Sequence, residues 1–192
     1  MGVHSYAVVI YIAAVAVGAS GLAALGWRLH PLHEDDMVAL LVLCGMGILG
    51  ESVRESDVGR KTGLSFTSIV SLTSVALLGP FGAAVVGAVA HLFELNKHPF
   101  QVRVFNSAMT SAFGAVGGLV YLLTGGAIGA IGVRGVWPIL IHVGAPLMLA
   151  DIVICLLNAL ILSGIVRLTQ GIPIRRFVLG MLGTSGPSYV GY

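Results

Sequence analysis

The sequence predicts an all-α integral membrane protein with about six transmembrane helices. Of its 192 residues, 57% are hydrophobic and only 9% are charged, whereas soluble domains carry about 25% charged residues. The apolar residues lie in long runs that short charged segments separate. The 27 glycines are typical of helices that pack closely together in lipid.

The N-terminal part contains two predicted spans. The first apolar run, Tyr6 to Leu25, has 20 residues and lacks the basic segment of a signal peptide, so it is long enough to cross the membrane itself. The second run, Met37 to Gly50, has 14 residues. We expect it to span by extending beyond one of its ends.

The central apolar run, residues 64–95, is interrupted once, at Gly79-Pro80. Each half is short for a crossing, and the two together are too long for a straight one. Proline is tolerated at the start of a helix, where its missing N–H needs no partner. We therefore predict a short hairpin broken at Gly79-Pro80, and the backbone groups freed at the break favour a place in a cavity wall.

Two further spans are predicted in the C-terminal part. The run from Val104 to Leu123 contains the GxxxG pair Gly114 and Gly118. The run from Trp137 to Val166 is interrupted by Pro146. It would reach about 45 Å as a straight helix, more than the hydrocarbon core of about 30 Å, so it should be kinked, tilted or protruding. These elements form one polytopic domain, residues 1–176. Residues 177–192 read as the start of a further hydrophobic segment that is truncated.

The distribution of Lys and Arg favours the hairpin over one long central span. With a turn at Gly79-Pro80, eight of these residues fall on one side and two on the other, whereas a single span divides them four to six. Positive residues stay on the cytoplasmic side. We therefore predict a multi-pass protein of the bacterial cytoplasmic membrane with both termini in the cytoplasm.

Asp151 is the most informative single residue, because an ionisable group within a membrane helix usually faces the bundle interior or a water-filled cavity. Asn158 lies seven residues later on the same helix face, and Asn106 and His142 are polar residues that can approach it from elsewhere. Two interpretations stay open. These residues form a ligand-binding site or proton-linked switch, or they tie helices together structurally.

Other polar groups give weaker signals. The predicted external loop HPLHEDD contains His30, His33 and Glu34, whose spacing matches no closed zinc site; a solvated loop is the simpler interpretation and ion sensing the alternative. His91 and Glu94 are more typical of an interfacial polar cluster. No catalytic motif or cofactor signature is present, so we expect no enzyme activity in these residues. The net charge of +2 also argues against nucleic acid.

Three stretches carry a resemblance to a known family: LSFTSIVSLTSVALLGP at 64–80, the helix with Phe105-Asn106, and GIPIRRF with PSYVGY at 171–192. From about residue 51 onward the chain resembles the N-terminal membrane domain of actinobacterial-type signalling proteins with HD-phosphohydrolase or GGDEF cyclase output domains. The resemblance implies a sensory module that controls a cytoplasmic output domain absent from this chain, and we expect a homo-oligomer.

Two alternatives stay open. Short, glycine-rich helices with a broken hairpin also resemble the substrate-binding subunit of energy-coupling-factor vitamin transporters. That interpretation predicts a small molecule held near Asp151. The third class is a structural subunit of a larger membrane complex.

Overall fold

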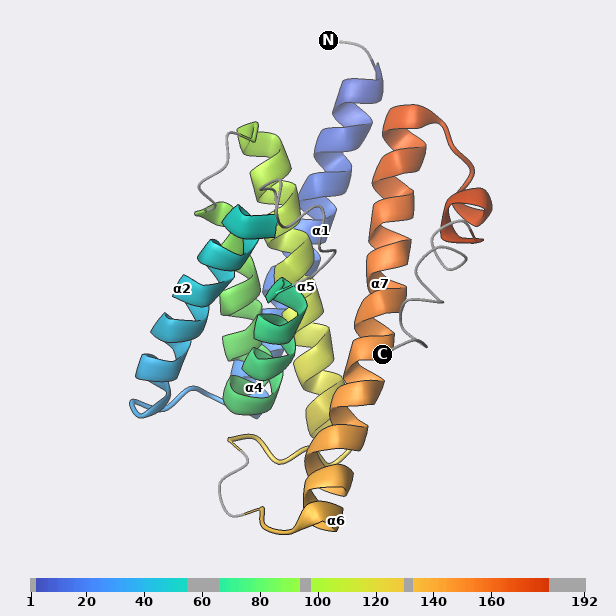
Figure 1. The fold of residues 1–192 in the computed structure, drawn as a ribbon. Helices are drawn as coiled ribbons and strands as arrows, with labels where there is room; N and C mark the ends of the chain where they lie inside the picture. Colours follow the sequence, from blue (N-terminus) through green and yellow to red (C-terminus); the bar gives the residue numbers. More distant parts are fainter. Residues whose placement is uncertain (1–2, 55–65, 94–97, 130–132, 180–192) are drawn as a thin grey trace.

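The computed structural model describes residues 3–54, 66–93, 98–129 and 133–179, and every element in these ranges is helical. The chain forms one bundle of helices that run up and down alternately (Figure 1). The elements, in chain order, are α1 (Val3–Leu29), α2 (Asp36–Arg54), α4 (Phe66–Leu92), α5 (Phe100–Leu123), α6 (Val136–Ile139), the π-helical turn η1 (Leu140–Gly144) and α7 (Ala145–Gln170).

Within the described ranges, four helical segments are long and apolar enough to cross a membrane: Tyr6–Leu29, Phe66–Leu92, Phe100–Leu123 and Val136–Gln170. The count of six spans stays a prediction. The second predicted run does form a helix, extended at both ends to the 19 residues of α2. It is not among the four, and Asp36, Glu51 and Arg54 lie near its two ends.

The predicted break at Gly79-Pro80 is present, and the chain reverses there. Gly79 has φ 67° and ψ −165°, which are not helical. Val70 from the first half of α4 and Val86 from the second half lie in one buried cluster with Leu43 of α2. In a straight helix those two valines would be about 24 Å apart at 1.5 Å per residue, so the two halves form a hairpin (Figure 1).

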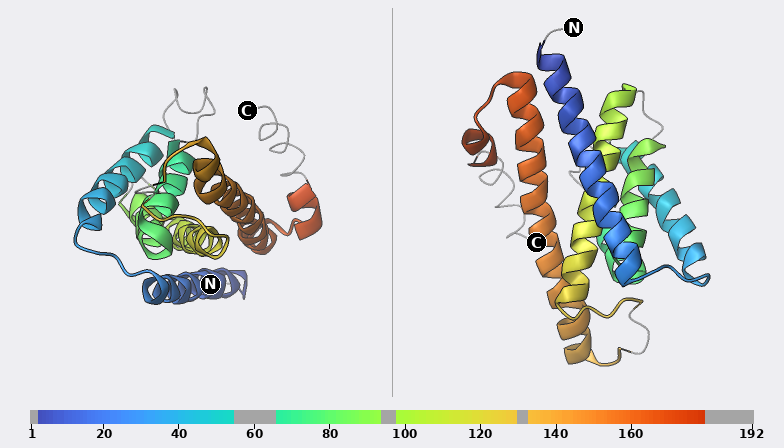
Figure 2. Two further views of the ribbon diagram at one scale, coloured as in Figure 1. Left: turned by 90° about the horizontal axis from the view of Figure 1, so that it is seen from below. Right: turned by 180° about the vertical axis from the view of Figure 1, so that it is seen from behind.

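The hairpin turn lies at the same end of the bundle as the α1–α2 and α5–α6 connections. A Cβ placed on Gly79 would lie 2.9 Å from both the His30 Cδ2 and the Ile128 Cδ1 atoms. The backbone N–H of Gly129 also donates to the Ala76 carbonyl oxygen at 2.9 Å. The start of α1 and the end of α7 lie together at the opposite end (Figure 2).

Helix α5 lies at the centre and contacts α1, α4 and α7 (Figure 2). Its predicted GxxxG pair meets the second half of α4 backbone to backbone. A Cβ on Gly114 would lie 2.3 Å from the Ala83 carbonyl oxygen, and one on Gly118 would lie 2.3 Å from the Pro80 Cα. The GxxxG prediction of close helix contact is therefore confirmed.

The last long segment is irregular near Pro146, as predicted. The π-helical turn η1 joins α6 to α7 directly before Ala145, and Pro146 occupies the first turn of α7. Because the helix continues through η1, the missing N–H of Pro146 leaves the His142 carbonyl oxygen free to accept from the Ala127 N–H and the Tyr121 hydroxyl. Helix α7 ends at Gly171, whose left-handed backbone allows its N–H to donate to the Arg167 carbonyl oxygen.

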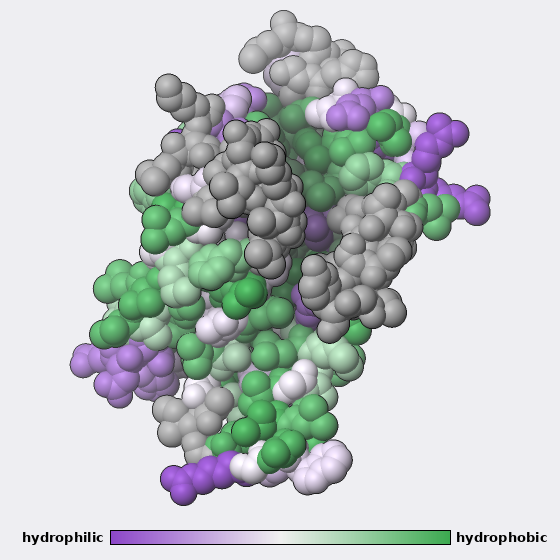
Figure 3. Space-filling view, viewed as in Figure 1, coloured by the Kyte–Doolittle hydropathy of each residue, from purple (hydrophilic) through white to green (hydrophobic). Residues whose placement is uncertain are grey.

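Large apolar side chains remain exposed on the two outer helices, and the space-filling view shows apolar residues over most of the visible middle of the molecule (Figure 3). On α1 they include Ile10 and Val17, and on α7 Ile152 and Leu160. Such a surface is suited to contact with lipid tails. Hydrophilic groups lie mainly toward the two ends of the same view.

The α4–α5 contact predicts unequal effects of two Gly→Ala substitutions. Gly114→Ala should lower the free energy of unfolding by about 1–3 kcal/mol because the new methyl group meets backbone that cannot move aside. Gly18→Ala is the matched control, since nothing lies within 4 Å of its Cβ position. It should be neutral or slightly stabilising. Denaturant unfolding in detergent measures both; equal losses would contradict the contact.

Candidate functional site

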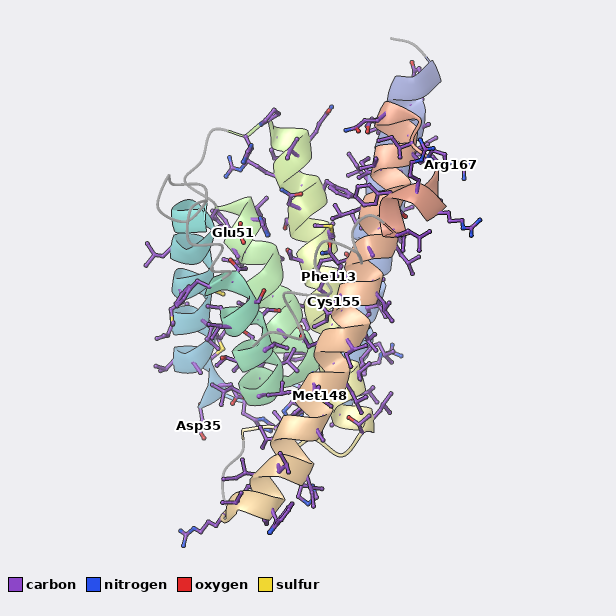
Figure 4. The ribbon with its side chains drawn as sticks, turned by 45° about the vertical axis from the view of Figure 1, so that its right-hand side comes forward. Asp35, Glu51, Phe113, Met148, Cys155 and Arg167 are labelled. Atoms are coloured by element: carbon purple, nitrogen blue, oxygen red, sulfur yellow. The ribbon has the colours of Figure 1, made fainter. Side chains whose placement is uncertain are left out.

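A cavity of about 370 Å³ lies inside the bundle, between α2, both halves of α4, α5 and α7. Its volume is near the lower end of the range for small-molecule sites, about 300–1,000 Å³. Phe113 of α5 and Cys155 of α7 lie near each other at this cavity, and Glu51 borders it from α2 (Figure 4). The polar residues of its wall are Glu51, Thr67, Ser68, Ser71, His91, Asn106, Thr110, Asp151, Cys155 and Asn158.

Three of the four predicted site residues meet at this cavity. Asp151 and Asn158 lie on one face of α7, with Cys155 between them, and Asn106 reaches the same space from α5. All three are partly buried. Their side chains form no hydrogen bond or ion pair with another residue of the described part of the chain. A cavity wall with unsatisfied polar groups is suited to a polar ligand or to water.

The hydroxyl-rich start of α4 lines the opposite wall. Thr67, Ser68 and Ser71 border the cavity, whereas Ser74 is fully buried and donates back to the Val70 carbonyl oxygen at 2.7 Å. The Thr67 Oγ1 atom is buried and has no hydrogen-bond partner in the described ranges. One wall of the cavity is therefore rich in hydroxyls and the other in amide and carboxylate groups.

A buried acid–imidazole pair also borders the cavity. The Glu51 Oε1 and His91 Nε2 atoms are 3.7 Å apart, and the two residues are 2% and 4% exposed. Glu51 lies near the end of α2 and His91 in the last turn of α4. The interfacial cluster predicted for His91 and Glu94 stays a prediction. Glu94 lies outside the described residues.

A signal for the position of Glu51 was present in the sequence. The buried residues of α2 are Leu40, Leu43, Cys44, Gly47, Gly50 and Glu51. They recur at helical spacing, so Glu51 continues the apolar face of α2 by one turn. The charged neighbours that follow it in the sequence concealed this periodicity.

His142 does not take part in the cavity. It lies in the π-helical turn at the other end of the bundle, where its side chain is exposed and its Nδ1 is 3.4 Å from the Gly125 carbonyl oxygen. Its own carbonyl oxygen accepts hydrogen bonds from the Ala127 N–H and the Tyr121 hydroxyl. The observed contacts of His142 hold the loop after α5 against η1.

The loop between α1 and α2 shows structural contacts. The backbone N–H of His33 donates to Asp36 Oδ2 at 2.8 Å, and the His33 Nδ1 is 3.7 Å from the same oxygen. His30 packs beside Gly79, and Glu34 is exposed. No three His, Cys, Asp or Glu side chains in the described ranges are placed to share a metal ion. The ion-sensing alternative therefore gains no support from this loop.

Comparison of the chain with protein-family models, with curated proteins and with solved structures finds no match. The cavity therefore has to be interpreted from its own chemistry. Among the lining residues that the structure describes, the charged and titratable side chains are two carboxylates, one imidazole and one thiol, and none is Lys or Arg. This arrangement suits hydrogen bonding to a polar ligand of neutral or positive charge.

Glu51 and His91 should be energetically coupled. Glu51→Gln and His91→Asn should each destabilise the fold, because each leaves its buried partner facing a group that no longer complements it. The double variant should lose less than the two single losses together, by about 0.5–3 kcal/mol. Unfolding of the four proteins in detergent gives this coupling energy. Strict additivity would show that the two side chains do not interact.

Proposed function

We propose that this protein is a membrane-embedded sensory module that binds a small molecule in the cavity and regulates a cytoplasmic output domain or partner protein. The observation that supports the proposal is that Asp151, Asn158 and Asn106, whose side chains have no partner within the described ranges, line the same cavity. Polar groups in a membrane helix are costly and usually functional. Complementary groups on a bound ligand would offset that cost.

The position of the cavity supports transmission of a signal. A ligand there touches α7 on one side and the α4 hairpin on the other, so its binding would favour one spacing of these two elements. Helix α7 then leads, through Gly171, into a segment that contains Arg175 and Arg176. A shift of α7 would be passed to whatever lies at that end of the bundle.

We further propose that the bundle lies in the bacterial cytoplasmic membrane as six alternating segments with both termini in the cytoplasm. Arg28 ends α1 and Arg134 precedes α6, at the end that holds few basic residues, and Arg167 lies at the other end. This distribution follows the positive-inside rule. The two short halves of α4 are two of these six segments, and other helices of the bundle cover part of their surface, so lipid does not surround them on every side.

One observation favours the transport alternative. The two halves of the interrupted hairpin border the same cavity as Asp151, whereas the break at Gly79 lies at the end of the bundle away from it. Discontinuous helices line the binding sites of many transporters. Uptake separates the two functions. A substrate-binding subunit should support accumulation of the ligand in cells together with its ATPase partner, whereas a sensor should bind the ligand without moving it.

Asp151→Asn should abolish ligand retention. Protein extracted gently from its native membrane should carry a bound small molecule in native mass spectrometry, and the Asp151→Asn variant should have lost at least about nine-tenths of it because the charge-assisted contact is gone. Asp35→Asn is the matched control, since it makes the same chemical change at an exposed loop residue. Equal occupancy in both variants would sink the proposed site.

Cysteine labelling tests the orientation. In a Cys44→Ala, Cys155→Ala background, a membrane-impermeant maleimide added to intact cells should label Asp35→Cys, because that exposed loop position lies outside in the proposed topology. Gln170→Cys, exposed at the other end, should react only after the membrane is permeabilised. The reverse pattern would show that the orientation is inverted.

A further inference from the structure

The charge of the cavity narrows the class of ligand. Two carboxylates, Glu51 and Asp151, border it, and His91 is its one imidazole. Glu51 lies 3.7 Å from His91. Even a protonated His91 would therefore balance only the charge of Glu51 and leave the charge of Asp151 unbalanced. Within the described ranges, Asp151 has no ion pair and no Lys or Arg lines the space.

An ionised Asp151 is unfavourable in this setting without a positive partner, because its charge lies in a bundle of low dielectric constant. Each of the two carboxylates, when ionised, would also repel an anionic ligand. A phosphate or carboxylate ligand is therefore disfavoured. A positive charge on a ligand would complement an ionised Asp151.

The rest of the lining suits an organic cation rather than a bare metal ion. Metal binding needs several oxygen or nitrogen ligands around one point, and the described residues contain no group of three His, Cys, Asp or Glu placed for it. Large apolar side chains also border the cavity, namely Leu72, Met109, Phe113, Ile154 and Leu162. They offer contact to a hydrocarbon body, while the Asn106 and Asn158 amide oxygens can accept N–H groups.

We propose that the cavity binds a small organic ammonium compound, with Asp151 as the counter-ion of its N–H group, the Asn106 and Asn158 amides as further hydrogen-bond partners, and the apolar residues of α5 and α7 against its hydrocarbon part. This inference rests on the proposed function, because it names the ligand class of that same cavity. A volume of about 370 Å³ limits the ligand to a small molecule.

Three probes of similar shape and different charge test the inference: phenethylammonium, phenethyl alcohol and 3-phenylpropionate. Binding is measured by thermal unfolding and isothermal titration of the protein in phosphatidylcholine nanodiscs, whose zwitterionic lipid does not attract amines by net charge. Phenethylammonium should bind at least about tenfold more tightly than the alcohol because only the cation forms a charge-assisted hydrogen bond. The carboxylate should not bind.

Two variants assign the preference to Asp151. Asp151→Asn, which keeps the size of the side chain and removes its charge, should reduce the preference for the ammonium over the alcohol to about threefold or less. Asp35→Asn should leave it unchanged. The melting temperature of each variant without a probe shows that it is folded, and Asn158→Leu should weaken both the cation and the alcohol because both use the amide.

The outcomes separate the two proposals. If the alcohol or the carboxylate binds as tightly as the ammonium, and Asp151→Asn weakens that binding, the cavity is a ligand site but its preference for organic cations is wrong. If sodium chloride alone stabilises the protein through Asp151, the occupant is a metal ion and the inference is equally wrong. If none of the probes binds, the cavity is not a small-molecule site, and both proposals fall.

Discussion

The backbone contact between α5 and the second half of α4 is the interaction on which the rest of the bundle depends. Gly87, Gly114 and Gly118 let the two helices approach without side chains between them. The Ser107 and Thr110 hydroxyls donate across this contact to the Ala88 and Gly87 carbonyl oxygens at 2.8 and 2.7 Å. Because the reversal at Gly79 ties the first half of α4 to the second, this contact also positions the hydroxyl-rich wall and, through Val70 and Val86, helix α2.

The cavity follows from an imbalance of side-chain size around α5. Small residues separate α5 from the second half of α4, whereas large ones separate it from α7, where Phe105, Met109 and Phe113 pack with Ile154 and Ile161. The hairpin is thus held close to α5 while α7 stands further off. The space between the first half of α4 and α7 is then left for Asp151 and Asn158 on one side and Thr67 and Ser71 on the other.

The features that the sequence predicted correctly are those that depend on local chemistry. The break at Gly79-Pro80, the GxxxG contact and the shared face of Asp151 and Asn158 all follow from the backbone of one or two helices. The partner of Glu51 could not be predicted in this way, because it lies on a helix forty residues away and its burial depends on how α2 meets the hairpin. His142 was misplaced for a related reason: a π-helical turn and the loop after α5 determine where it lies.

The choice between a structural and a functional role for Asp151 depends on how the other polar groups of the bundle are satisfied. Away from the cavity, hydroxyls of the described helices donate to backbone carbonyls: Tyr11 to Ile161 at 2.8 Å, Ser163 to Leu160 at 2.7 Å and Ser74 to Val70. A carboxylate that tied helices together would accept a hydrogen bond from a donor on a neighbouring helix. Three hydrogen-bonding side chains have no such partner in the described ranges, and all three border the same cavity: Asp151, Asn158 and Asn106. This shared position favours a common external partner over three separate structural contacts.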